Sequence, residues 1–333
     1  MTTLSTAYPT LLDVAKRLDP GGKIDMIAEL LNATNPILDD MTYSEGNLPT
    51  GHKSTVRTYL PTASFRKLYG VTASQKSETA QIIDSCGMIE NYAVVDKALA
   101  DLNGNTSEFR LSENKAFVEA MSQKVASSIF YANENLVPEG FTGLAPRYAS
   151  KTGTNAANLL DGGGVSGQTD CTSIWLVGWG PDTCFGIYPK GSMAGIQMND
   201  KGQVTLQNPN GLTGYMEAYM THYRWDMGLV LRDWRYAVRI HSIDTSTLTG
   251  DLSAGSDLVD LMVQAEELIP NLSGCRPVFY MNRKLMSFMR RQKIKKTAYN
   301  LTDETVGGKH VTMFDGIPVR RTDALVSTET SLN

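Results

Sequence analysis

The sequence predicts an α+β fold, and three features of its pattern support that class. One long helical stretch, residues 112–133, runs without a proline or glycine. Five segments between 173 and 240 are strand-like. Near the end, Asp315-Gly316 lies between two apolar runs, which is a strong short-range signal for a β-hairpin.

The long helix is predicted to be the structural centre of the chain. Its apolar face contains a row that recurs every four residues and a second row that widens it: Phe117, Met121, Val125, Ile129, Ala116, Ala120, Ala126 and Phe130. We expect the first four to be largely buried. Ser112 is a suitable N-cap, and Glu113 lies in the first turn, where the helix dipole favours an anion.

Composition indicates a globular protein and narrows the classes of function. Of the 333 residues, 41% are hydrophobic and 20% are charged, which argues against disorder. The formal net charge is −4, whereas a protein that holds DNA or RNA tightly is usually basic, because phosphate contacts supply most of the affinity. No apolar run is long enough to span a membrane, and the N-terminus lacks the pattern of a signal peptide.

The sequence gives no constellation of residues for catalysis, a cofactor or a metal, so an enzyme is not expected. The cysteines are scattered, as buried thiols in a reducing compartment are: Cys86, Cys171, Cys184 and Cys275. The histidines are isolated, and we expect His222 and His241 to be structural. Gly162, Gly164 and Gly167 match G-x-G-x-x-G, but no helix pattern follows, so a flexible loop is favoured. A hydrolase that uses the loop 161–170 remains an alternative.

The first part of the chain is predicted to pack against other surfaces, either of its own body or of a neighbour. Short helices are expected at 10–18 and 24–31, and neither can bury its apolar stripe alone. Weak alternation at 53–60 and 64–69, around Pro61, predicts an extended hairpin. This hairpin has too few apolar residues for a core of its own, and an isolated two-stranded hairpin is marginal in water.

The remaining elements are predicted in a fixed order. A mostly buried strand at 81–95 and a short helix at 96–102 precede the long helix, and a loop-rich connection at 139–167 follows it. Strands are expected at 173–178, 183–188, 193–198, 214–223 and 229–240, followed by an amphipathic helix at 257–268 and a buried strand at 277–281. Asn282 then caps a further helix, and the closing hairpin pairs 311–314 with 317–321.

Two groups of basic residues are candidates for contacts between subunits. Lys53, Arg57, Arg66 and Lys67 lie in the expected hairpin and could meet an acidic surface of a neighbour. A second group, Arg290, Arg291 and Lys293, opens a basic run at a helix end. A solvated end that complements the helix dipole is the favoured interpretation of this run; the alternatives are a phosphate or an acidic partner, including a second copy of the chain.

Several stretches, in this order, resemble one protein family. These are LPTASFRKLYGV, FTGLAPRYAS, SIWLVGWG, GIYPKG, GLVLRDWRYAVRI, PVFYMNRKLMSFM and FDGIPVRRTDAL. Together with the order of elements they resemble the major capsid proteins of tailed, and in particular short-tailed, bacteriophages, which have the HK-ninety-seven-like fold. The resemblance implies a structural protein of the virion, whose shell encloses double-stranded DNA. The other classes left open are a tail tube or decoration protein.

The resemblance also implies an organisation and partners. It places an N-terminal arm at 1–42, an E-loop hairpin at 43–78, a peripheral domain at 79–170 with a spine helix at about 107–133, an axial domain with returning peripheral strands at 171–308, and a closing hairpin and tail at 309–333. Expected partners are copies of the chain in hexamers and pentamers, a separate scaffolding protein, a portal and a decoration protein. Packaged DNA would be contacted weakly, without sequence specificity. Assembly in the host cytoplasm is implied, and a membrane is not.

Overall fold

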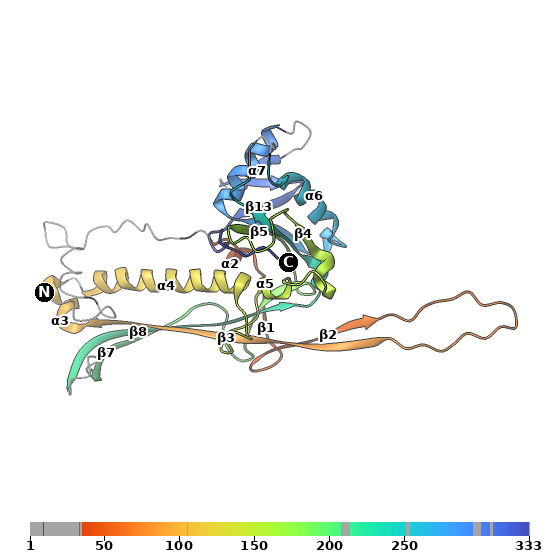
Figure 1. Ribbon diagram of the computed structural model, residues 1–333. Coiled ribbons are helices and arrows are strands. Elements are labelled where there is room, and N and C mark those ends of the chain that lie inside the picture. The colour runs from red at the N-terminus through yellow and green to blue at the C-terminus, as the bar shows by residue number, and fades with distance from the viewer. Residues whose placement is uncertain are drawn as a thin grey trace.

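The computed structural model describes residues 9, 33, 35–104, 106–207, 214–250, 254–295, 301–306 and 309–332. The helices expected at 10–18 and 24–31 lie outside the described residues. The α+β class is confirmed, because one long helix lies beside a sheet of mostly antiparallel strands and shorter helices cover the other part of that sheet (Figure 1).

An elongated part, here called the long layer, carries the longest helix. Helix α4 (Thr106–Tyr131) lies along two antiparallel strands, β3 (Glu78–Asp96) and β8 (Tyr215–Leu231) (Figure 1). Strand β7 (Gln197–Gln207) pairs with β8. Strand β2 (Gly51–Tyr59) pairs with the first part of β3, and this hairpin projects past the end of α4.

A compact body stands on one side of the long layer (Figure 1). Its central strand β5 (Cys171–Trp179) pairs with β9 (Ala237–Asp244) on one side and β10 (Arg276–Met281) on the other. Helices α6 (Leu258–Glu267) and α7 (Arg283–Lys295) pack beside these strands. Every residue of β5 is buried, in agreement with its apolar run from Ile174 to Trp179.

Strand β5 divides two hydrophobic cores, because successive side chains of a strand point to opposite faces. Trp175, Val177 and Trp179 belong to the core beneath α4. Ile174 and Leu176 belong to the core beneath α6 and α7. Strand β10 divides its side chains between the same two cores. Helix α4 therefore packs on one face of this sheet, and helices α6 and α7 pack on the opposite face.

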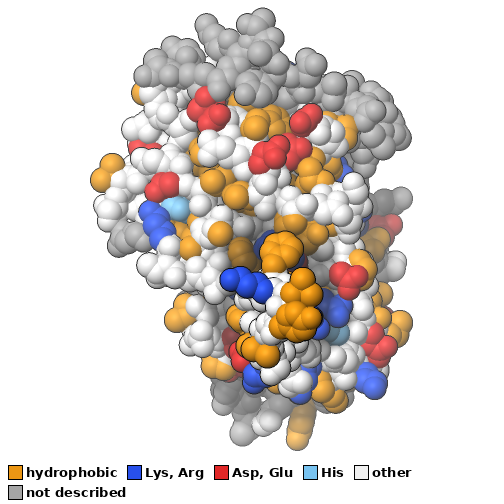
Figure 2. Space-filling model, turned by 90° about the vertical axis from the view of Figure 1, so that its right-hand side faces the viewer, with side chains coloured by type: hydrophobic (Ala, Val, Ile, Leu, Met, Phe, Trp, Pro, Cys, Tyr) orange, Lys and Arg blue, Asp and Glu red, His pale blue; other side chains and the backbone are white. Residues whose placement is uncertain are grey.

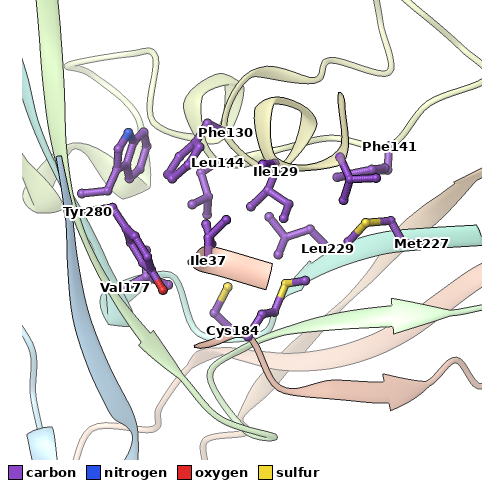
Figure 3. Packing of buried hydrophobic residues seen from close by; sticks show 14 of the residues in the cluster. Ile37, Ile129, Phe130, Phe141, Leu144, Val177, Cys184, Met227, Leu229 and Tyr280 are labelled. Atoms are coloured by element: carbon purple, nitrogen blue, oxygen red, sulfur yellow. The ribbon is translucent and has the colours of Figure 1, made fainter. Parts of the chain in front are cut away.

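The core beneath α4 confirms the predicted apolar face of the helix in its C-terminal half. Met121, Val125 and Ile129 are buried, and Figure 3 shows Ile129 near Ile37 of the short helix α2 (Ile37–Asp40). Phe117 is only half-buried, and Ala116 and Ala120 are exposed. The N-terminal half of the helix continues past the compact body along the strand pair, so only one side of it meets apolar partners (Figure 1). The helix begins at Thr106, and the N-cap role predicted for Ser112 is wrong.

Side chains cap the N-terminal ends of helices α6 and α7 in the compact body. Asp257 accepts a hydrogen bond from the backbone N–H of Asp260 at the start of α6, at 3.1 Å. Asn282 caps α7 as predicted, accepting from the N–H of Leu285 at 2.8 Å. The closing hairpin is also confirmed, as β12 (Lys309–Phe314) and β13 (Ile317–Arg321). Its turn residues Asp315 and Gly316 both have positive φ, 46° and 82°, which suits a two-residue hairpin turn.

Two predicted strand arrangements are wrong. Strand β2 pairs with residues 78–85 of β3, not with 64–69, and the first six residues of β3 are exposed. Segments 214–223 and 229–240 do not form two strands with those bounds, because β8 continues to Leu231 and β9 starts at Ala237. Within β8 the Arg224 guanidinium donates a hydrogen bond to the Asp226 carboxylate at 2.9 Å. The expected strand 193–198 begins later, as β7.

Short elements connect these parts. The helix expected at 96–102 is α3 with Asp96 as its N-cap, followed by a 3₁₀ turn, and the loop-rich connection contains α5 and a further 3₁₀ turn. Their bounds, with those of the remaining short strands and turns, are α3 (Lys97–Ala100), η1 (Leu102–Gly104), α5 (Leu144–Arg147), η2 (Thr154–Asn158), β1 (Tyr43–Glu45), β4 (Leu159–Asp161), β6 (Cys184–Tyr188), η3 (Trp234–Tyr236), η4 (Leu272–Gly274) and β11 (Leu301–Val306).

Candidate assembly surfaces

The root of the β2–β3 hairpin is held rigidly against the rest of the long layer. Asp84 of β3 is buried and forms an ion pair with Arg147 of α5, with Nη1 and Oδ1 2.8 Å apart. The same guanidinium donates to the backbone oxygens of Thr142 at 2.9 Å and Leu229 at 3.1 Å. Burial raises the pKa of Asp84, and Arg147 opposes that rise. At Gly51, a Cβ atom would lie 2.1 Å from the backbone oxygen of Asp84, so the strands can approach only with glycine there.

Beyond this root the hairpin projects away from the other described parts of the chain (Figure 1). Residues 60–77, here called the hairpin tip, form no strand, and every side chain from 60 to 69 is exposed. A turn closes the tip, with the N–H of Gly70 donating to the oxygen of Lys67 at 3.0 Å. Tyr69 in this turn has φ of 60°, which is rare for an aromatic residue.

The tip is apolar as well as basic, and the sequence-based interpretation missed the first property. Phe65, Leu68, Tyr69 and Val71 are each at least 87% exposed. Figure 2 looks at the molecule from the side to which the hairpin projects, and hydrophobic side chains gather with basic ones in the middle of the view. The signal was present in FRKLYGV, where four large apolar residues lie in a segment without a core. Such a group of exposed apolar side chains is typical of an interaction site.

The seven basic residues singled out in the sequence form two separate groups. Lys53, Arg57, Arg66 and Lys67 are exposed along the hairpin, and no acidic side chain in the described part of the chain pairs with them. The other three lie on α7, at the far side of the compact body from the hairpin (Figure 1): Arg290, Arg291 and Lys293.

The α7 residues are engaged within the chain. Arg290 donates to the hydroxyl of Thr312 at 2.5 Å. The guanidinium carbon of Arg291 lies 4.2 Å from the ring centre of Phe288, a cation–π arrangement. Lys293 is half-buried and also interacts with another group. These partners favour the interpretation of a helix end that is stabilised locally.

A groove of about 350 Å³ lies between the C-terminal end of α4 and β3. It is here called the α4–β3 groove, and its wall includes Met88, Lys124, Leu136, Val137 and Glu139. In this wall Met88 is 55% exposed, Leu136 79% and Val137 57%, so the described part of the chain leaves these apolar side chains largely uncovered. This surface was also missed in the sequence, where Leu136-Val137 reads as part of a loop.

The loop and the two histidines considered for catalysis make structural contacts within the chain. The loop at 161–170 is tied to β9, with the N–H groups of Gly162 and Gly164 donating to the oxygens of His241 and Ser242 at 2.8 and 2.7 Å. His241 and Ser242 are 1% and 3% exposed, so no substrate reaches them, and burial lowers the pKa of His241 to about 4. His222 stacks on Tyr92 with ring centres 4.5 Å apart. These contacts agree with the structural roles expected for both histidines.

Metal-ligating groups, thiols and membrane-spanning helices were considered as well. Within the described ranges, no group of histidine, cysteine and acidic residues is placed to hold a metal ion. The four cysteines are free thiols, and burial is the main cause that raises the pKa of each. None of the helices in the described part of the chain is long and apolar enough to cross a membrane.

Comparison with known proteins identifies the family. The family model for the major capsid protein GP7 matches residues 19–333. A solved structure of bacteriophage Epsilon15 is 34% identical, with a TM-score of 0.80, and 100% of this chain and 99% of that chain are covered. The bacteriophage JBD30 capsid is a weaker likeness that adds nothing to the assignment, with 9% identity, a TM-score of 0.47, and 90% of this chain and 95% of that chain covered. No curated protein matches.

These findings confirm the resemblance on which the fold and function were expected. The family and fold are those of a structural protein of the virion, not of an enzyme, and capsid structures imply that copies of the chain assemble with one another. The projecting hairpin and the uncovered apolar surfaces agree with that role. The chain therefore belongs to the family of the major capsid protein GP7, the proteins that form the capsid shell.

Proposed function

We propose that the β2–β3 hairpin is the E-loop of this capsid protein and the main device by which neighbouring subunits hold one another. The observation that carries this proposal is the exposed apolar tip on a hairpin that has no core. An isolated hairpin is marginal in water, and exposed apolar side chains gain free energy when another surface covers them. In a closed shell every such tip has a neighbour.

The basic residues of the hairpin then serve as contacts between subunits. Lys53, Arg57, Arg66 and Lys67 are exposed and would face acidic groups of a second copy. An exposed ion pair contributes roughly 0–1 kcal/mol, so these contacts tune assembly rather than drive it. The group on α7 has partners within the chain and is a weaker candidate.

The division of the chain extends the same proposal. The arm is 1–42, the E-loop 43–78, the peripheral domain 79–170, the axial domain with returning peripheral strands 171–308, and the closing hairpin and tail 309–333. The two cores on opposite faces of β5 support a separation between peripheral and axial parts. The ladder from Gly51 to Ser85 suggests that the E-loop continues past residue 78 to the root.

Further partners of the chain are expected because a capsid subunit builds a closed shell. We propose hexamers and pentamers, assembled in the host cytoplasm around a separate scaffolding protein, with a portal and a decoration protein as further partners. The net charge of −4 supports a lining that contacts packaged DNA weakly and without sequence specificity, since a basic lining would bind the phosphates.

Electron microscopy of negatively stained particles tests this function. The full chain, expressed with and without a scaffolding protein, should give closed icosahedral shells in at least one condition. Tubes would instead indicate a tail component, and a protein that adds only to pre-formed shells would indicate a decoration role. The chain with residues 60–77 excised serves as the matched control and should give no shells.

A further inference from the structure

We infer that the outer side of helix α7 is a phosphate-binding surface through which the chain contacts packaged DNA, an assignment that rests on the proposed function of the chain as a shell subunit. The sequence of α7 is RKLMSFMRRQKIK, so six of its 13 residues are basic and none is acidic. The whole chain has a formal net charge of −4. Positive charge is therefore concentrated on one helix of an otherwise acidic protein, as on surfaces that bind nucleic acid.

Helix α7 separates its apolar and basic residues onto two sides. The inner side is buried in the compact body and includes Leu285, Met289 and Gln292. At 3.6 residues per turn, the six exposed positions fall within about 120° of the helix circumference and extend over roughly 17 Å. They form one continuous strip, here called the α7 basic face, in which four of the six side chains are cationic: Arg283, Lys284, Ser287, Arg290, Arg291 and Ile294.

The contacts that hold Arg290 and Arg291 leave their positive charges uncompensated. Arg290 donates to a hydroxyl group, and Arg291 stacks on the ring of Phe288, so both partners are neutral. Within the described ranges, no acidic side chain forms an ion pair with Lys284, Arg290 or Arg291. The basic face therefore presents three cations that are positioned on the surface and can still bind an anion.

The first turn of α7 shows that stabilisation by the helix dipole does not account for the basic face. Arg283 and Lys284 lie in this turn, where the positive end of the dipole disfavours cations. Asp323 offsets this effect for Arg283 through two hydrogen bonds of 2.6 Å. Lys284 has no such partner among the described residues. Its position is unfavourable in the free subunit and becomes favourable when an anion binds.

The composition of the basic face fits phosphates better than it fits an acidic protein. The centre of a protein interface is usually apolar, and Ile294, at one end of the strip, is the only apolar side chain among the six exposed residues. Arginine, lysine and serine side chains are common contacts of phosphate oxygens in DNA. A strip of roughly 17 Å spans about half a helical turn of duplex, which carries about one charge per 1.7 Å.

The same features predict weak binding without sequence specificity. Contacts to phosphate carry no sequence information. Each copy presents three such cations, and the rest of the chain is acidic, so the affinity should fall steeply as salt is added. The basic face thus gives packaged DNA a defined but reversible contact on each subunit.

The anisotropy of a labelled DNA duplex of random sequence, titrated with the unassembled full chain at several salt concentrations, tests the assignment. Lys284→Gln/Arg290→Gln/Arg291→Gln should weaken binding roughly tenfold or more at low salt. It should also reduce the slope of log K against log salt by up to about 2.7, because each lost phosphate contact removes about 0.9. The matched control, Lys53→Gln/Arg57→Gln/Lys67→Gln, removes the same charge from the hairpin and should change the affinity by less than about twofold.

A second variant separates charge from folding. Lys284→Glu/Ser287→Glu keeps the contacts of Arg290 and Arg291, so it should weaken DNA binding similarly while its melting temperature stays unchanged. Poly-glutamate should compete poorly with DNA. Unchanged DNA affinity in both α7 variants would overturn the inference, and so would displacement of DNA by poly-glutamate at equal charge, which would assign the face to an acidic protein.

Negative-stain microscopy of the same proteins separates this inference from the proposed function. Both α7 variants should still form shells wherever the unaltered chain does. Normal shells together with unchanged DNA affinity would refute the basic face alone. Absence of shells from the unaltered chain would refute the proposed function, whereas the DNA measurement is made on unassembled chain and does not depend on shells.

Discussion

Glu329 and Arg239 form a buried ion pair between residues 90 positions apart, with Nη2 and Oε2 separated by 3.0 Å and both side chains less than 8% exposed. The Glu329 carboxylate also accepts hydrogen bonds from Ser173 of β5 and from the hydroxyl of Tyr131 at the end of α4. The C-terminal segment thus joins α4 to the central strands of the compact body. Neighbouring tail residues add backbone bonds, including Glu329 to Cys171 and Ser331 to Gln168.

Replacing Glu329 by alanine should destabilise the subunit strongly. Arg239 would then remain buried without its counter-charge, a change that typically costs about 3–5 kcal/mol. Glu329→Gln keeps a polar group of the same shape and should cost less. Thermal unfolding followed by circular dichroism compares the three proteins. Equal melting temperatures for Glu329→Ala and the unaltered chain would show that the tail does not hold α4 to the sheet.

The face of α4 that packs on the sheet is tested by Val125→Asp. Val125 is fully buried, so an unpaired carboxylate there is very costly, and we expect little soluble folded protein. Val118→Asp is the matched control, because Val118 is 36% exposed on the same helix and should be tolerated. Soluble yield and melting temperature measure both. A soluble Val125→Asp subunit with an unchanged melting temperature would contradict the observed packing.

The pKa of Glu266 predicts how stability depends on pH. Burial, assisted by Asp315 and Glu267, raises the pKa of this carboxyl from 4.5 to about 7. Because the folded-state pKa lies above the unfolded one, the protonated group favours folding below about pH 4.5, and this contribution is lost as pH rises through 7. Glu266→Gln should therefore melt higher than the unaltered chain at pH 8 and nearly equally at pH 4.5. Glu267→Gln should reduce the loss only in part. Parallel melting curves at all pH values would refute this.

The hairpin cations predict how assembly depends on salt. Charge reversal at Arg57, Arg66 and Lys67 together should weaken assembly more at low than at high ionic strength, because salt already screens exposed charges. Light scattering during assembly at two salt concentrations measures the difference. The same reversal at Arg290, Arg291 and Lys293 is the control, and we expect a smaller dependence on salt. Identical salt curves for the two triple variants would remove the distinction between the two groups.

The parts of the fold that depend on local pattern could be predicted from the sequence. The row Met121, Val125 and Ile129, the cap at Asn282 and the Asp315-Gly316 turn each involve residues close together in the chain. Strand pairing could not be predicted in the same way. The partner of β2 begins 19 residues after Tyr59, and the sequence does not indicate this register, because the first six residues of β3 and most of β2 are not buried and show no continuous apolar face.

The candidate surfaces were predicted only in part, for a related reason. Basic side chains in a polar segment suggested an exposed hairpin, and the exposure of Lys53 and Arg57 agrees. Phe65 and Tyr69 looked like ordinary strand residues, because a sequence does not distinguish an apolar side chain in a core from one presented to a partner. The groove joins Met88 and Val137 from distant segments, so it exists only in the folded chain.

The most direct test of the account is sedimentation velocity on the chain lacking residues 60–77, with Tyr59 and Glu78 joined by Asn-Gly and circular dichroism recorded in parallel. The excised residues are almost all exposed, so the spectrum and melting temperature should match those of the unaltered chain, while sedimentation should show only monomers or capsomer-sized species. Normal shells from this variant, or loss of its folded signal, would contradict the assignment of the hairpin tip as an assembly element.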